Sequence, residues 1–247
     1  MHAYVINMAE SVDRKNNMSN VLSGIENLEF EFITAINGRK LADNEIQKKF
    51  NIIESEKRYF KKIQLGEIGC TLSHQKFYKQ LLASNYEYVF IFEDDIYLRF
   101  SKDEISKIFK LAVEQLNNNI PTVILFSGWN YYTNKKRIDQ KYYKTKVVDG
   151  YLAHAYLINR KAAELMIEER PWMLADNWKY FIKKGIKILG IIPHSINQNG
   201  KIKSDITSSM DRFKFNGGFI QLCFRRFYHL LFMITGHFEK PDKDYIC

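Results

Sequence analysis

The fold is decided by residues 66–98, which read GEIGCTLSHQKFYKQLLASNYEYVFIFEDDIYL. The first half carries apolar residues at helical spacing, among them Cys70, Phe77 and Leu81, and predicts a helix. The second half contains YVFIF at 88–92, an uncharged aromatic and β-branched run that is typical of a buried strand. A helix that leads into a buried strand predicts an α/β fold built around this segment.

Three acidic residues, Glu93, Asp94 and Asp95, end that predicted strand. Adjacent carboxylates repel one another, so water, cationic side chains or a divalent metal must surround them. Ligands bind at the carboxyl ends of strands in α/β sheets, which favours a metal or ligand site here. A solvated turn after a core strand is the alternative that the triplet alone leaves open.

Predicted strands and helices alternate along the rest of the chain. We expect strands at 3–8, 28–36, 123–126, 142–148, 151–158 and 186–192, helices at 11–23, 43–62, 103–116, 162–168 and 178–184, and a loop across 128–141. This alternation predicts a mainly parallel sheet with helices on both faces. The 247 residues fit one such domain with an appended tail.

Composition narrows the class of protein. The net charge is +9, and one basic cluster, KKRIDQKYYKTK, lies at 135–146. No helix-turn-helix, RNA-binding or zinc-finger pattern accompanies these charges, so we expect a phosphorylated substrate or an anionic membrane and no nucleic acid. Three scattered cysteines, Cys70, Cys223 and Cys247, predict reduced thiols. The N-terminus has no basic leader with a long apolar run, which predicts a cytoplasmic protein.

The tail, residues 211–247, is basic and apolar. After Gly217 and Gly218 it is apolar on most faces, but Arg225 and Arg226 interrupt it, and the apolar run is too short to span a bilayer. We expect an amphipathic helix that lies peripherally on the inner face of the cytoplasmic membrane, with arginines toward anionic head groups. A core helix or a dimer-forming helix is the alternative.

Several segments together resemble one known family. They are GEIGCTLSH at 66–74, FIFEDD at 90–95, YVINM at 4–8 with Asp13-Arg14, AYLINRKAA at 155–163, Asp176-Asn177-Trp178, and 193–198 with Ser204-Asp205-Ile206. In this order they are similar to glycosyltransferase family 25. That family contains bacterial lipooligosaccharide sugar transferases and relatives that galactosylate collagen.

The resemblance implies a GT-A-type, Rossmann-like domain over residues 1–210, with a nucleotide-sugar-binding half at 1–98 and an acceptor-binding half at 99–210. It implies inverting, metal-dependent transfer of galactose or glucose from UDP-galactose or UDP-glucose to a lipooligosaccharide or lipopolysaccharide acceptor. A catalytically inactive module that binds glycan or membrane, and a metal-dependent phosphoesterase, are the alternatives.

The acidic triplet is similar to the DxD motif of GT-A enzymes, with Glu in the first place. A hard cation such as Mn²⁺ or Mg²⁺ held there neutralises the pyrophosphate leaving group. By this analogy Asp95 contacts the metal, and Glu93 or Asp94 contacts the ribose, the sugar or a metal-bound water; Glu93 is also a candidate metal ligand. His194, after the last predicted strand, is a candidate for a further metal or phosphate ligand, followed by Gln198.

Donor-binding candidates lie at the end of the first strand and in the helix after it. Ile6 and Asn7 can meet a uracil or ribose, and the resemblance implies a pyrophosphate contact for Arg14. The alternative for Arg14 is a solvated position paired with Glu10.

The motif at 66–74 supplies further candidates. Gly66 and Gly69 permit a close approach at a helix start, where free N–H groups favour anions, and packing explains them nearly as well. Ser73 and His74 are donor-site candidates through their place in the motif. A lone histidine on such a helix face is more often a satisfied core residue.

Asp176 is the predicted catalytic base. Inversion requires a carboxylate, away from the metal, that takes the proton of the acceptor hydroxyl. The alternative is an N-cap of the following helix, a role compatible with catalysis.

Overall fold

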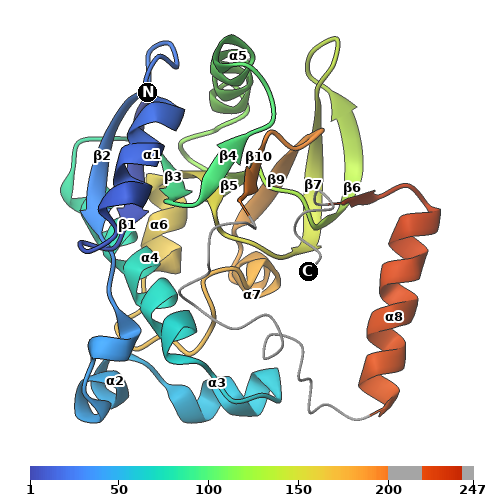
Figure 1. The fold of residues 1–247 in the computed structure, drawn as a ribbon. Coiled ribbons are helices and arrows are strands. Elements are labelled where there is room, and N and C mark those ends of the chain that lie inside the picture. The colour runs from blue at the N-terminus through green and yellow to red at the C-terminus, as the bar shows by residue number, and fades with distance from the viewer. Residues whose placement is uncertain (200–218, 241–247) are drawn as a thin grey trace.

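The computed structural model describes residues 1–199 and 219–240, and over these ranges the fold is mixed α/β. Its strands are β1 (His2–Asn7), β2 (Glu29–Thr34), β3 (Tyr88–Glu93), β4 (Ile96–Leu98), β5 (Thr122–Leu125), β6 (Asn130–Arg137), β7 (Tyr143–Gly150), β8 (Ala155–Asn159), β9 (Lys187–Ile192), β10 (Ile196–Gln198) and β11 (Phe238–Glu239). In the described part, nine strands form one sheet in the order β11-β6-β7-β9-β5-β8-β3-β1-β2 (Figure 1). The other two, β4 and β10, form an antiparallel pair.

The expectation of a mainly parallel sheet is wrong. Parallel pairs are β1–β2, β1–β3 and β5–β9. The remaining pairs, β3–β8, β5–β8, β7–β9, β6–β7 and β11–β6, are antiparallel. A short apolar run marks a strand as buried but does not fix its direction, and β6 and β7 form a hairpin, which is antiparallel by construction. The sheet is therefore mixed.

The loop expected across 128–141 is also wrong, because residues 130–137 form β6. Only the first three residues of this strand are buried, and its charged second half is largely exposed. Register shifts interrupt its pairing with β7. A strand that leaves the core in this way carries no alternating apolar pattern, so the sequence gives no strand signal there.

The helices are α1 (Val12–Leu22), α2 (Asp43–Lys49), α3 (Ile52–Tyr59), α4 (Leu65–Ala83), α5 (Lys102–Val113), α6 (Arg160–Met166), α7 (Trp178–Lys183) and α8 (Phe219–Ile234), with a 3₁₀ turn η1 (Gly38–Lys40). The predicted helix at 43–62 divides into α2 and α3, because Phe50 leaves the helical conformation and the side chain of Asn51 caps α3. The other helices expected before residue 185 are confirmed.

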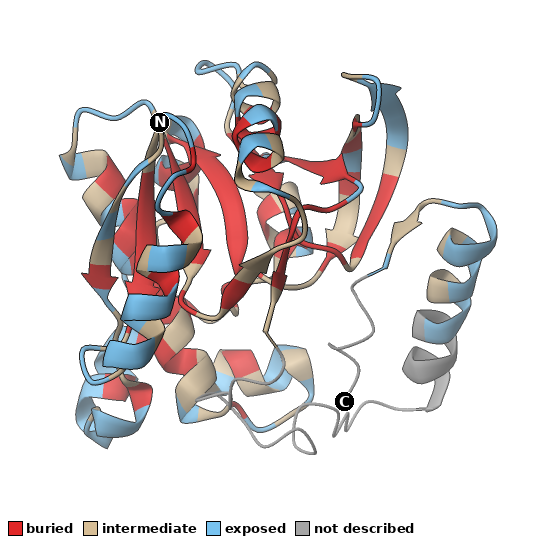
Figure 2. Ribbon diagram, turned by 45° about the horizontal axis from the view of Figure 1, so that its top comes forward, coloured by how far each residue is buried: buried red, intermediate tan, exposed pale blue. Residues whose placement is uncertain are grey.

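The sheet separates two apolar cores. Figure 2 shows that most of the residues in its central strands are buried. Neighbouring side chains of β3 alternate, so Val89 and Ile91 enter one core and Phe90 and Phe92 the other. Helices α4, α6 and α7 cover the first core, and α1 and α5 cover the second. Full burial of one such side chain contributes about 1.5–3 kcal/mol. Burial on both faces therefore holds β3 rigidly, and its carboxyl end carries the acidic triplet.

Helix α8 lies to one side of the sheet (Figure 1). Tyr131 of β6 packs against Tyr228 and Phe232 of this helix, and the chain then returns as β11 to pair with β6. The helix expected in the tail is thus present. Residues 200–218 and 241–247 lie outside the described part of the chain, and with them Ser204-Asp205-Ile206, Gly217, Gly218 and Cys247. Over the described ranges, no helix has the length and hydropathy that crossing a bilayer requires.

Candidate active site at the carboxyl end of β3

Asn7 and Asp94 meet where β1 and β3 end. The parallel register pairs Ile6 with Glu93, so the residues that follow leave the sheet side by side. Asn7 Nδ2 donates to Asp94 Oδ2 at 2.8 Å and to the carbonyl oxygen of Ser11 at 3.1 Å. Asp94 is buried. The amide of Asn7 therefore fixes both the acidic turn and the start of α1.

Arg14 faces two carboxylates of the triplet. Its Nη1 lies 3.1 Å from Asp94 Oδ1, and its Nη2 lies 3.2 Å from Asp95 Oδ2. The alternative pairing of Arg14 with Glu10 is not what the structure shows, because Glu10 pairs with Lys40 at 2.9 Å. The structure thus places Arg14 in the acidic site.

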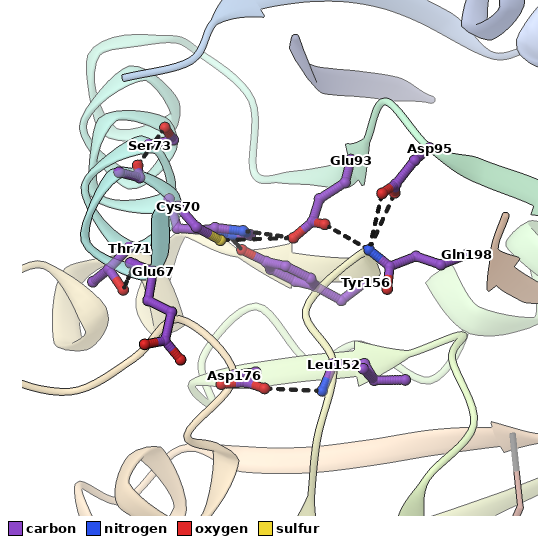
Figure 3. A network of polar contacts seen from close by, with 12 residues as sticks. Glu67, Cys70, Thr71, Ser73, Glu93, Asp95, Leu152, Tyr156, Asp176 and Gln198 are labelled. Carbon is purple, nitrogen blue, oxygen red and sulfur yellow. Dashed lines mark hydrogen bonds and ion pairs between the residues drawn. The ribbon is translucent and has the colours of Figure 1, made fainter. Parts of the chain in front are cut away.

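Gln198 joins the two outer members of the triplet. Its Nε2 donates to Glu93 Oε2 at 3.0 Å and to Asp95 Oδ1 at 3.1 Å (Figure 3). The β4–β10 pair places Gln198 opposite Ile96, and Asn199 N donates to the carbonyl oxygen of Asp95 at 2.7 Å. The short antiparallel pair therefore brings a residue from the end of the predicted domain to the acidic turn.

Among the residues that the structure describes, the acidic site has three carboxylates and one guanidinium. Burial, followed by the negative charge of Glu93, raises the pKa of Asp95 to about 7, although Arg14 acts in the opposite direction. Gln198 holds oxygens of Glu93 and Asp95 close together, and these oxygens could serve as ligands of a divalent cation. All-oxygen donors of this kind suit Mg²⁺ or Mn²⁺. The residues present therefore fit the cation that the resemblance implies.

On its other side, Glu93 faces α4. Its Oε1 lies 3.5 Å from His74 Nε2 and 3.8 Å from Cys70 Sγ. His74 Nδ1 lies 2.7 Å from the hydroxyl of Tyr156, which also lies 3.2 Å from the hydroxyl of Tyr78. Burial, then the charge of Glu93, holds the pKa of the Cys70 thiol well above its usual range. His74 thus stands between a core tyrosine and the acidic site.

Gly69 and Ser73 of the GEIGCTLSH motif lie where α4 packs against residues 36–38. A Cβ on Gly69 would lie 2.5 Å from the carbonyl oxygen of Ile36 and 2.6 Å from the nitrogen of Gly38. Ser73 Oγ donates to the carbonyl oxygen of Gly69 at 2.7 Å and accepts from Ile36 N at 2.8 Å. Gly66 lies in the first turn of α4 and is partly exposed. The close approach of η1 to α4 therefore accounts for Gly69 and engages the hydroxyl of Ser73.

Asp176 lies on a segment separate from the triplet (Figure 3). Its Oδ2 accepts from Leu152 N at 3.3 Å, and burial raises its pKa. It does not cap α7, because that role belongs to Asn177, whose Oδ1 accepts from Tyr180 N at 3.1 Å. The N-cap alternative is thus wrong, and the raised pKa brings this carboxyl closer to the range of a general base.

His194 lies in a different set of contacts. Its Nδ1 is 2.8 Å from Glu239 Oε1, and its backbone nitrogen donates to the same oxygen at 2.8 Å. Arg99 Nη1 donates to the carbonyl oxygen of His194 at 2.7 Å. Glu239 belongs to β11, so these contacts tie the loop after β9 to the returning tail.

Sequence reasoning missed three residues that support the site. Tyr156 orients His74 through the contact of its hydroxyl with Nδ1. Its position on a predicted buried strand could have indicated that its hydroxyl needs a polar partner. Tyr59 accepts from Leu174 N at 3.0 Å and from Asn177 Nδ2 at 2.6 Å, which holds the segment of Asp176. Neither Tyr59 nor Glu239 lies in a motif, so nothing in the sequence pointed to them.

Comparison with known proteins identifies the family. Residues 1–177 match the model of glycosyltransferase family 25, described as an LPS biosynthesis protein. A glycosyltransferase 25 family member of Aedes aegypti is 32% identical over 182 residues, which cover 69% of this chain and 28% of that protein. For a Haemophilus influenzae protein the identity is 30% over 170 residues, covering 68% of this chain and 57% of that protein. Human procollagen galactosyltransferase 2 is 27% identical over 184 residues, which cover 68% of this chain and 28% of that protein.

The chain therefore belongs to glycosyltransferase family 25. The shared region makes up less than two thirds of the length of each of these relatives. The match includes β1, α4, β3 and the segment of Asp176.

Proposed function

We propose that this chain transfers galactose or glucose from a UDP-sugar to a lipooligosaccharide or lipopolysaccharide acceptor, with inversion of configuration, in a GT-A-type arrangement. The observation that carries the proposal is the acidic triplet at the carboxyl end of β3, with Arg14 facing two of its carboxylates. Family membership supports sugar transfer, and the oxygens of Glu93 and Asp95, which Gln198 holds together, support a divalent cation in the donor site.

Within the proposed site, each acidic residue has its own part. Bound Mn²⁺ or Mg²⁺ would neutralise the charge that develops on the pyrophosphate leaving group. Asp95 and Glu93 would hold it, because Gln198 keeps their carboxylates together. Asp94 has one oxygen toward Arg14 and the other toward Asn7, so it would position the turn.

Other donor-site roles follow from position. Ile6 and Asn7 remain predicted uridine-site residues at the end of β1, and the side chain of Asn7 is engaged by Asp94. Arg14 would face the pyrophosphate. Gly66, Ser73 and His74 remain predicted donor-site residues. His194 remains a predicted further metal ligand through Nε2, since Glu239 occupies Nδ1.

Asp176 would act as the general base. It stands apart from the acidic triplet, as an acceptor-side base must (Figure 3). Burial raises the pKa of Asp176, which makes its carboxylate a stronger base. This assignment agrees with the proposed halves, in which 1–98 binds the donor and 99–210 binds the acceptor.

We also propose that α8 places the enzyme on the inner face of the cytoplasmic membrane. Phe227, Leu230, Leu231 and Ile234 recur at helical spacing, and their exposed fractions are 65, 54, 46 and 75%. Figure 2 shows exposed residues in the C-terminal part of α8, where burial is described. A helix that exposes such a stripe can insert it at a lipid surface, and the exposed Arg226 would favour anionic head groups.

Calorimetric binding of UDP tests the donor site, with ADP and GDP as competitors and with Mn²⁺ present or chelated. We expect Mn²⁺-dependent binding that is selective for UDP and lost in Asp95→Ala. Glu26→Ala is the matched control, because it removes an exposed carboxylate paired with Lys110. Equal UDP affinity with and without Mn²⁺ would contradict the proposal.

The alternatives are separated by turnover. A transferase consumes UDP-galactose or UDP-glucose rapidly only with an oligosaccharide acceptor, whereas a phosphoesterase consumes the donor equally well without one. Failure to bind any nucleotide would favour an inactive glycan- or membrane-binding module.

A further inference from the structure

We propose that Cys70, His74 and Glu93 form a second cation site that takes a thiophilic divalent metal such as Zn²⁺. This site is distinct from the all-oxygen site proposed at Asp95. The two sites share Glu93 but use opposite oxygens, since Oε1 faces Cys70 and His74 and Oε2 accepts from Gln198 (Figure 3).

The spacing of the three ligand atoms suits a small tetrahedral ion. Cys70 and His74 are four residues apart on α4, so their side chains lie on one face of the helix. Glu93 Oε1 lies 3.8 Å from Cys70 Sγ and 3.5 Å from His74 Nε2, and all three atoms lie within 4.8 Å of one another. Zinc bonds of about 2.3 Å to sulfur and about 2.0 Å to nitrogen and oxygen place neighbouring ligands roughly 3.3–3.6 Å apart. A small inward movement would complete the coordination.

The imidazole of His74 provides an independent observation. The side chain is 1% exposed, and Nε2 faces Glu93 Oε1 at 3.5 Å without a hydrogen bond of ordinary geometry to any described residue. A buried polar nitrogen without a hydrogen bond destabilises a fold, and a metal ligand bond would satisfy it. Tyr156 holds Nδ1 at 2.7 Å, which fixes the ring with Nε2 toward Glu93. A hydrogen bond to the second ring nitrogen is the usual support of a metal-bound histidine.

The donor types decide the kind of metal. Thiolate and imidazole ligands favour Zn²⁺ and related ions, whereas Mg²⁺ and Mn²⁺ favour oxygen. Cys70, His74 and Glu93 supply one sulfur, one nitrogen and one oxygen. Three protein ligands leave a fourth position for water, as in open zinc sites.

Cobalt is the probe, because thiolate-bound Co²⁺ absorbs in the near ultraviolet and Co²⁺ substitutes for Zn²⁺. We expect chelator-treated full-length protein to develop this absorption up to about one equivalent of Co²⁺ and to lose it when Zn²⁺ is added. Cys70→Ser should abolish the band. The double variant Cys223→Ser/Cys247→Ser is the matched control and should keep it.

An absent band in the wild type, or a band that persists in Cys70→Ser, would overturn the proposal. If Cys70→Ser does not fold, X-ray absorption spectroscopy of the zinc-loaded wild type takes the place of this variant. A zinc coordination shell without sulfur would then overturn the proposal. UDP binding with Mn²⁺ is measured on the same wild-type sample. Loss of the cobalt band with intact UDP binding therefore rejects the second site alone.

Discussion

Arg14 and Asp95, which are 81 positions apart in the chain, lie side by side, with 3.2 Å between Nη2 and Oδ2. The other arm of the guanidinium faces Asp94. Asp95 also lies beside Glu93 through the shared donor Gln198. Arg14 therefore compensates only part of the charge, and burial next to Glu93 leaves Asp95 with a pKa of about 7.

Metal-dependent donor binding should depend on pH through Asp95. A cation needs the deprotonated carboxylate, so Mn²⁺-dependent affinity for UDP should weaken by about tenfold per pH unit below the pKa of Asp95 and level off above it. Calorimetric titration at a series of pH values measures this slope. Arg14→Met should move the midpoint to higher pH, because it removes the charge that lowers this pKa. A flat profile across neutral pH would argue against Asp95 as the ligand.

The same pKa predicts a stability effect in the metal-free protein. The pKa of Asp95 is raised from 3.8 to about 7, so the folded state holds the proton more tightly than the unfolded state. The stabilisation that comes from tighter proton binding by Asp95 is fully present below pH 3.8 and is lost as pH rises through about 7. Asp95→Asn keeps a neutral side chain at every pH, and its free energy of unfolding should therefore fall less than that of the wild type over this interval. Denaturant unfolding of both proteins measures the difference, and parallel curves would contradict it.

Asp176 and Asn177 should have separable roles. Asp176→Asn keeps an acceptor for Leu152 N but removes the base, so kcat should fall by about 10²–10⁴ with UDP affinity unchanged. Asn177→Ala removes the cap of α7 and should cost about 1 kcal/mol of stability with a smaller loss of kcat. Steady-state kinetics and thermal unfolding distinguish them. Near-normal kcat in Asp176→Asn would remove this residue from the mechanism.

Gly69→Ala should destabilise the fold. Its Cβ would meet backbone atoms of Ile36 and Gly38, which cannot rotate away as a side chain can. Overpacking of this kind typically costs about 1–3 kcal/mol, and we expect the upper part of that range in denaturant unfolding. Leu65→Ala, at an exposed position of the same helix, is the control and should change stability little. Wild-type stability in Gly69→Ala would show that η1 and α4 can move apart.

The exposed stripe of α8 should bind anionic vesicles. Phe227→Ser/Leu230→Ser/Ile234→Ser should abolish sedimentation with vesicles that contain anionic lipid, because it removes the apolar face. Ile53→Ser is the control, since Ile53 is an exposed apolar residue on α3. Unchanged sedimentation of the triple variant would contradict membrane contact. Conversion of a dimer to a monomer would instead identify the stripe as a subunit interface.

The sequence predicts well what local patterns determine. The helix at 66–84 and the strand at 88–92 appear as α4 and β3, because apolar periodicity and short buried runs reflect burial directly. Strand direction escapes prediction because it depends on pairing with distant segments, and β6 escapes it because its exposed, charged half carries no alternating apolar pattern.

The sequence likewise predicts some residues of the candidate site and misses others. Acidic residues and Arg14 stand in recognisable motifs, and the structure brings them together with Gln198. The N-cap of α7 shifts by one residue, from Asp176 to Asn177, which is within the usual uncertainty of helix boundaries. Contacts from remote residues, such as Tyr59 to the loop of Asp176, leave no mark in the local sequence.

The two residues of β11 have a consequence for how the tail can be studied. They pair with Asn130 and Tyr131 at the start of β6, and Glu239 reaches His194. Removing the tail would expose the outer edge of β6 at its buried start, where another molecule can pair with it, and exposed strand edges promote aggregation. Precipitation of a truncated protein would therefore be explained by the loss of the β11–β6 pairing, whatever α8 binds. Point substitutions on the exposed face of α8 keep the β11–β6 pairing and therefore test the function of the helix by itself.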